Sequence, residues 1–251
     1  MTYLIAVLIA VPLALCISPF ASGWMDTLYK EGVGVLSFPE SIARRARFRR
    51  LLLPLGYFLV FFLSIWSTYN AIGAWTPLAI PAFFLRAVTG VLLWTMSMTD
   101  LEQYVLFNRM MRPLIFLGLF SALPGEILQL AHYGAFPDLM AALGTEKVEA
   151  LRMVLLPGAT DAAFPAAFIS GAIALALATL TQGGIGGGDV KLLFALGLLL
   201  GGERMLSTVF LGSIAGGVGA FLYLFFLHGQ RKDALAYGPY FAVPGIFFLM
   251  M

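Results

Sequence analysis

Long runs of apolar residues, separated by short polar stretches, dominate the chain of 251 residues. A helix that crosses the hydrocarbon core of a bilayer, about 30 Å thick, needs about 20 apolar residues at about 1.5 Å per residue. Eight runs approach this length, although the sixth and the eighth are short. We therefore predict an all-α polytopic membrane protein with about eight transmembrane helices, at residues 3–22, 51–72, 77–98, 113–133, 162–181, 189–201, 205–227 and 237–251.

The composition supports this fold class and narrows the chemistry. Hydrophobic residues make up 61% of the chain and charged residues only 11%, which excludes a soluble domain, where about 25% are charged. A net charge of +2 is too even to predict a nucleic-acid partner. One cysteine, Cys16, and two histidines provide too few ligands for a structural zinc site, so we expect no metal and no cofactor.

The basic residues predict the orientation of the helices. With the loop at residues 24–50 on the cytoplasmic side, eleven of the 15 Lys and Arg lie in cytoplasmic loops, three lie outside, and Arg86 lies within a span. This asymmetry follows the positive-inside rule and places both termini outside. The long outer segment at residues 134–161 is expected to form a short surface helix and a turn.

Two carboxylates stand at predicted membrane boundaries. Asp100 closes the third span and Asp189 opens the sixth, both on the cytoplasmic side. Two carboxyl groups at one depth can share a proton and a water, so that one acts as an acid and the other as a base. The start of a helix favours Asp189 as the ionised member. The alternative interpretation is an ordinary helix cap at Asp189 and a solvated boundary residue at Asp100.

A glycine-rich segment precedes Asp189. Five glycines occupy the six positions 183–188, and among them Gly186 and Gly188 are expected to let a peptide or a helix approach the carboxylate closely. A phosphate-binding loop does not fit, because an acidic residue occupies the position where an anion would bind. A dinucleotide site also fails, since no βαβ unit follows.

Three motifs together resemble one family. The stretch from Gly186 to Asp189, followed by Val-Lys-Leu-Leu, resembles the GxGD motif of type IV prepilin peptidases, which are aspartic peptidases of the bacterial inner membrane. The Asp-Leu-Glu at Asp100 and the Tyr-Gly-Pro-Tyr that begins at Tyr237 are similar to two further motifs of that family. The resemblance covers about 150 residues and runs from the third span to residue 251.

The sequence also departs from the family pattern. Phe107 replaces a usual proline, and residues 24–50 contain none of the cysteine pairs that many members carry, in enzymes that also methylate the new amino terminus of the pilin. That second activity is therefore uncertain for this chain. We expect residues 1–251 to form one membrane domain, with a divergent part at residues 1–75 and a prepilin-peptidase-like core at residues 76–251.

The resemblance implies a membrane aspartic endopeptidase in which Asp100 and Asp189 activate a water. Its substrate would be a prepilin or pseudopilin, cleaved between a short basic leader and an apolar helix at the cytoplasmic face of the inner membrane. The rival class is a proton- or cation-coupled transporter in which the same aspartates form a relay. A third possibility is an inactive peptidase-like protein that serves assembly.

Four other charged residues have candidate roles. Glu102 is either a solvated loop carboxylate or an anchor for the basic residues of a substrate leader. Lys191 points about 200° away from Asp189 on a helix, so it either extends to lipid headgroups or tunes the field of the active site. Arg86 and Glu126, both within spans, are expected to pair with each other, and the alternative is that Arg86 marks a water-filled cavity.

Overall fold

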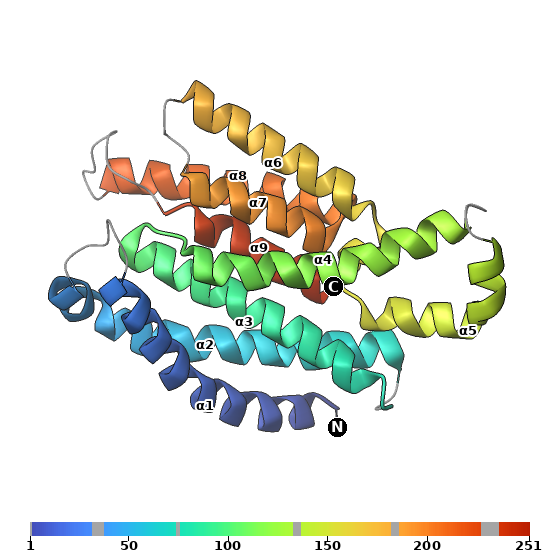
Figure 1. Ribbon diagram of the computed structural model, residues 1–251. Helices are drawn as coiled ribbons and strands as arrows, with labels where there is room; N and C mark the ends of the chain where they lie inside the picture. The colour runs from blue at the N-terminus through green and yellow to red at the C-terminus, as the bar shows by residue number, and fades with distance from the viewer. Residues whose placement is uncertain (1, 32–37, 74–75, 133–136, 182–185, 227–235) are drawn as a thin grey trace.

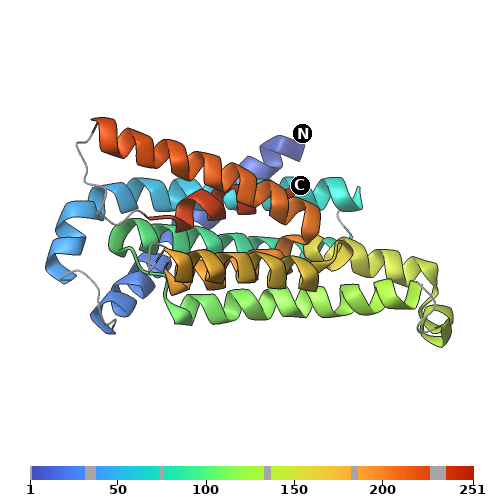
Figure 2. The ribbon, with the colours of Figure 1, turned by 90° about the horizontal axis from the view of Figure 1, so that it is seen from above.

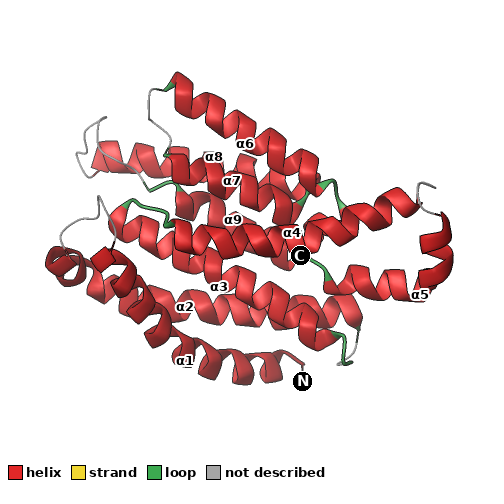
Figure 3. Cartoon of the chain, viewed as in Figure 1, coloured by secondary structure: helices red, strands yellow, loops and turns green. Residues whose placement is uncertain are grey.

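The computed structural model describes residues 2–31, 38–73, 76–132, 137–181, 186–226 and 236–251, and these residues form helices joined by short loops, with no strand among them (Figure 3). The helices are α1 (Thr2–Glu31), α2 (Phe38–Ile72), α3 (Ala79–Gln103), α4 (Asn108–His132), α5 (Pro137–Val154), η1 (Pro157–Thr160), α6 (Ala163–Leu180), α7 (Gly187–Leu200), α8 (Gly202–Phe226) and α9 (Gly238–Met250).

The predicted fold class is confirmed. Six helices, α1 to α4, α6 and α8, are long and apolar enough to cross a membrane, so the chain is a multi-pass membrane protein. The sixth and eighth predicted spans correspond to α7 and α9, which contain only 14 and 13 residues. Neither of these two helices reaches the length of the other six.

The largest difference from the expected boundaries is at α2. The span was expected to begin at Leu51, but α2 begins at Phe38 and includes the basic stretch that precedes the apolar run. Arg and Ala have high helix propensity, so this stretch continues the helix although it is too polar to lie in hydrocarbon. In the outer segment, the expected short helix and turn are present as α5 and η1, and Gly144 breaks α5 with φ 72°.

The helices run roughly parallel or antiparallel and form one elongated bundle (Figures 1 and 2). α1 packs on α2, α2 on α3, and α3 on α9, while α7 packs against α4 and α6. α3 and α7 are the innermost helices, and Leu93, Met96, Leu196 and Leu199 are buried between their neighbours. α5 projects from the bundle at the end opposite the α3–α4 loop (Figure 1).

This topology brings three helix ends together. The end of α3 and the starts of α7 and α9 lie at the same end of the bundle, on the left in Figure 1. These ends carry the three sequence motifs, which are separated by many residues along the chain.

Candidate active site

Asp100 lies in the last turn of α3 and is only 5% exposed. The helix ends just beyond it, because Tyr104 adopts a left-handed conformation (φ 56°) and its N–H donates to the carbonyl oxygen of Asp100. The carboxylate oxygen Oδ2 accepts a 2.8 Å hydrogen bond from the backbone N–H of Gly238, the first residue of α9. The end of α3 is thereby joined to the start of α9.

The contact between Asp100 and Gly238 requires a residue without a side chain. A Cβ atom at position 238 would lie 2.9 Å from Oδ2 and 3.2 Å from Cγ of Asp100. Such distances are shorter than normal van der Waals contact, so any larger residue would displace the carboxyl group. Gly238 was quoted from the sequence only as part of a motif, and no sequence signal predicted this direct contact.

Asp189 lies in the first turn of α7 and is partly exposed. Its Oδ2 accepts a hydrogen bond of 3.3 Å from the backbone N–H of Gly186, so the ordinary capping contact is present. One carboxylate oxygen, Oδ1, has no protein partner among the described residues. Of the glycine-rich segment, residues 183–185 lie outside the part of the chain that the structure describes.

The two aspartates lie at the same end of the bundle, where Asp100 contacts Gly238 of α9 and Asp189 lines the groove together with Tyr237, the residue before Gly238. Lys191 extends across to α4, where its Nζ donates a 2.8 Å hydrogen bond to Oδ1 of Asn108. Gly188 contacts the α3–α4 loop closely, because a Cβ atom there would lie 2.9 Å from Cβ of Leu106. Lys191 and Gly188 thus hold the start of α7 beside the end of α3.

An apolar groove leads to Asp189. The groove has a volume of about 830 Å³ and is lined by α6, α7, α8 and the start of α9. It extends from Ala162 and Gly202 at one end of the bundle to Thr181, Asp189 and Tyr237 at the other. Asp189 is the single carboxylate among the described residues that line it. A largely apolar segment could therefore lie along the groove and reach the aspartate with one end.

A comparison with known families decides the identity of this site. The model of the type IV leader peptidase family matches residues 87–221, more than half of the chain, and this region includes both aspartates. The chain belongs to the type IV leader peptidase family. No curated protein and no solved structure matches it. The chain is therefore a membrane-embedded peptidase of this family.

In this leader peptidase, Glu102 is not the solvated loop residue considered above. It is 2% exposed, and Nε of Arg49 donates a 2.7 Å hydrogen bond to its Oε1. Its Oε2 accepts hydrogen bonds from Nη2 of Arg49 and, at 2.8 Å, from the hydroxyl of Tyr29. Arg49 also pairs with Asp26 of α1. A substrate leader could bind Glu102 only by displacing Arg49.

The expected pair of Arg86 and Glu126 is wrong. Arg86 donates to the backbone carbonyl oxygens of Ala82 and Met153, each at 3.3 Å. Glu126 accepts a 3.4 Å hydrogen bond from the backbone N–H of Phe164. Each side chain reaches a backbone group on a nearby element, which the sequence could not predict because those contacts depend on tertiary packing.

Phe107, the departure from the family's proline, has a definite place in the leader peptidase. Its carbonyl oxygen accepts hydrogen bonds from the N–H groups of Met110 and Met111 at the start of α4. Its ring packs against Tyr29, with the ring centroids 5.8 Å apart. The loop after Asp100 is therefore anchored by packing against α1 and by the start of α4.

Proposed function

We propose that the chain is an aspartic endopeptidase in which Asp100 and Asp189 activate a water at the cytoplasmic face of the bacterial inner membrane. The observation that carries this proposal is the convergence of three motif segments at one end of the bundle, with Asp100 bound to Gly238 and Asp189 open to the apolar groove. Family membership favours peptide cleavage over an ion relay.

In the proposed reaction each aspartate accepts one proton and donates one proton. Asp189, at the positively polarised start of α7, is the ionised base and accepts a proton from the attacking water. Asp100 carries the other proton and donates it to the carbonyl oxygen of the scissile peptide as the C–O bond forms. The tetrahedral diol then collapses, the C–N bond breaks, and Asp189 returns its proton to the leaving nitrogen while Asp100 recovers one from the diol. One water is consumed, and the aspartates regain their initial states.

The proposed substrate is a prepilin or pseudopilin, in which a short basic leader precedes an apolar helix. α6 borders the groove over 18 residues, which corresponds to about 27 Å of helix and to most of a bilayer core. An apolar substrate helix lying along this groove would present the peptide bond before it to Asp189. The basic leader would then extend toward the side where most of the Lys and Arg of the chain are expected.

Removing the charge at the two positions while keeping the shape of the side chain provides the test. Asp100→Asn and Asp189→Asn should each abolish cleavage of a prepilin in isolated membranes, while Glu149→Gln, an exposed carboxylate on α5, should leave it unchanged. Protein abundance should match the wild type in all three variants. Near-normal cleavage by either Asn variant would contradict the two-aspartate mechanism.

A further inference from the structure

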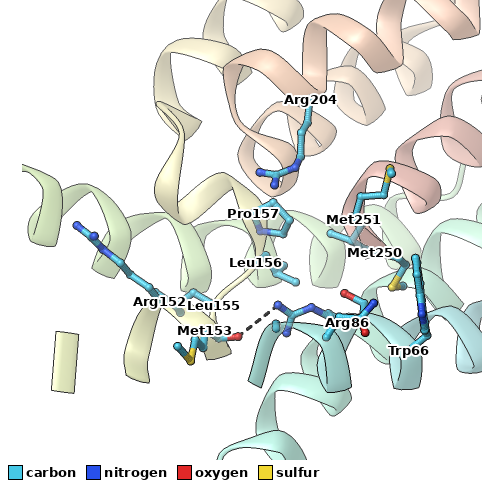
Figure 4. A pocket seen from close by; sticks show the side chains of 14 residues that line it. Trp66, Arg86, Arg152, Met153, Leu155, Leu156, Pro157, Arg204, Met250 and Met251 are labelled. Carbon is cyan, nitrogen blue, oxygen red and sulfur yellow. Dashed lines mark hydrogen bonds between the residues drawn. The ribbon is translucent and has the colours of Figure 1, made fainter. Parts of the chain in front are cut away.

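A second cavity, seen from close by in Figure 4, is lined by residues at the end of the bundle opposite the aspartates. It has a volume of about 350 Å³ and is lined by α2, α3, α8, α9 and the segment that joins α5 to η1. Arg86 lies 14 residues before Asp100 on α3, which corresponds to about 21 Å along the helix. The cavity is therefore separate from the candidate active site.

The wall of this cavity is positively charged. Arg86, Arg152 and Arg204 line it from three different helices, and Ser67 and Asn70 add neutral polar groups from α2. In Figure 4, Arg86 and Arg204 lie on two sides of Pro157, whereas the guanidinium of Arg152 points away from the cavity. Arg152 has a partner of its own, Glu149, at 3.4 Å. Arg86 and Arg204 are thus the two charges available to a ligand.

Arg86 is a buried cation without a counterion. It is 7% exposed, and it forms no ion pair with the described residues. Two of the five N–H groups of a guanidinium are used here, and their partners are uncharged carbonyl oxygens at 3.3 Å. A buried charge in a membrane protein is costly unless it is paired with an opposite charge or solvated. The remaining N–H groups therefore favour an anion in the cavity.

The distribution of basic residues singles out the same place. Only four of the 15 Lys and Arg are expected away from the cytoplasmic loops, namely Arg86, Lys147, Arg152 and Arg204. Three of these four line the cavity. Since the positive-inside rule disfavours basic residues on this side, their concentration around one hollow calls for a local reason. A bound anion supplies one.

We propose that this cavity binds a phosphate oxyanion, held by the guanidinium groups of Arg86 and Arg204. Guanidinium groups match phosphate geometry because they can donate two parallel hydrogen bonds to two oxygens. A volume of about 350 Å³ accommodates a phosphate group together with part of a glycerol ester. The phosphate belongs either to the headgroup of an anionic phospholipid or to a free inorganic phosphate, because both present the same oxyanion.

Binding to the purified full-length protein in detergent tests the proposal and separates the two sources. In one experiment the wild type and its variants are titrated with phosphatidylglycerol, and binding is monitored by native mass spectrometry. In a second experiment the same proteins are titrated with inorganic phosphate, and binding is monitored by calorimetry. Arg86→Gln and Arg204→Gln should each weaken binding about tenfold, because each removes a charged hydrogen-bonding partner. Arg112→Gln is the matched control, because it removes an exposed cation at the start of α4, away from the cavity. This variant should bind as the wild type does.

The outcomes distinguish the sources and decide the proposal. Arginine-dependent binding of phosphatidylglycerol alone identifies a lipid site, and arginine-dependent binding of inorganic phosphate identifies a free-anion site. If the Arg86→Gln protein does not fold, Arg204, which is only partly buried, provides the same comparison. Equal binding by wild type, Arg204→Gln and Arg112→Gln, or no binding of either probe by the wild type, would overturn the proposal. Prepilin cleavage is not part of this test, so the proposed anion site and the proposed peptidase mechanism can fail independently of each other.

Discussion

The backbone N–H of Gly238 donates a 2.8 Å hydrogen bond to Oδ2 of Asp100, although 138 residues separate the two in the chain. This bond fixes one oxygen of the carboxyl group against the start of α9. The position of Asp100 therefore depends on a helix that the match to the family model, at residues 87–221, does not include.

Gly238→Ala should inactivate the peptidase without unfolding it. The added methyl group would lie 2.9 Å from Oδ2 and would push the carboxyl group out of place. A displacement of about 1 Å at a reacting group can lower the rate about a hundredfold, and we expect a loss of that size in prepilin cleavage. Gly245→Ala on the same helix is the control, because its methyl group meets only the movable end of Leu196. Equal activity of the two variants would contradict a positioning role for Gly238.

The buried pair of Arg49 and Glu102 predicts a stability effect. Arg49→Met leaves Glu102 as a buried, unpaired carboxylate, and we expect the free energy of unfolding to fall by about 3–5 kcal/mol. The double variant Arg49→Met with Glu102→Leu should recover most of that loss, since no unpaired charge remains. Unfolding by SDS in mixed micelles measures the free energy of unfolding of both variants.

An exposed pair of the same kind provides the control for that experiment. Arg109 and Glu31 also form an Arg–Glu contact between two elements, but their side chains are 66% and 58% exposed. Arg109→Met should therefore lower stability by less than about 1 kcal/mol. If Arg49→Met is no more damaging than Arg109→Met, the network around Glu102 does not stabilise the fold. If a stable Glu102→Gln variant instead showed an increased KM for substrates with basic leaders, this result would support the role of Glu102 as an anchor for the leader.

The groove offers a way to test where the substrate helix lies. Gly217 lines the groove, and a Cβ atom at this position would meet nothing within 4 Å. Gly217→Leu should thus fill part of the groove without disturbing the fold, and it should raise KM for a prepilin about tenfold while kcat changes little. Gly23→Leu on α1, where the space is equally open, should cleave normally. Unchanged KM in the Gly217→Leu protein would exclude this groove as the substrate site.

The expected orientation can be tested by labelling single cysteines in a Cys16→Ser background. Arg45→Cys and Arg109→Cys should react only from the cytoplasmic side, and Lys147→Cys only from the outside. The expectation rests on the uneven distribution of the basic residues between the two sides. Labelling of Arg109→Cys and Lys147→Cys from the same side would contradict an odd number of crossings between them and would remove the argument for cytoplasmic aspartates.

Much of the fold follows from hydropathy alone, because each apolar run is long enough to specify a helix without help from its neighbours. The motifs likewise pointed to Asp100, Asp189 and the glycines before it. The failures share a physical cause. The partners of Glu102 lie on α1 and α2, and Arg86 reaches Met153 of α5. A single sequence contains no signal for which arginine or which carbonyl oxygen of another helix will be in reach.

Boundaries were predicted less well where polarity and helix propensity disagree. The basic start of α2 is too polar for the bilayer, so hydropathy placed the beginning of the predicted span at Leu51, yet the preceding residues are good helix formers. The contact between Gly238 and Asp100 was also beyond prediction, since a glycine within a sequence motif does not show which group approaches it.

The shortness of α7 has a consequence for the surrounding bilayer. Its 14 residues extend about 21 Å, which is roughly 9 Å less than the hydrocarbon thickness of a typical membrane. α7 lies among longer helices, so we expect its shortness to leave a recess before its first turn that polar solvent can enter. Asp189 lies in that turn, so this recess would give water a path to a bond that the lipid tails would otherwise keep dry.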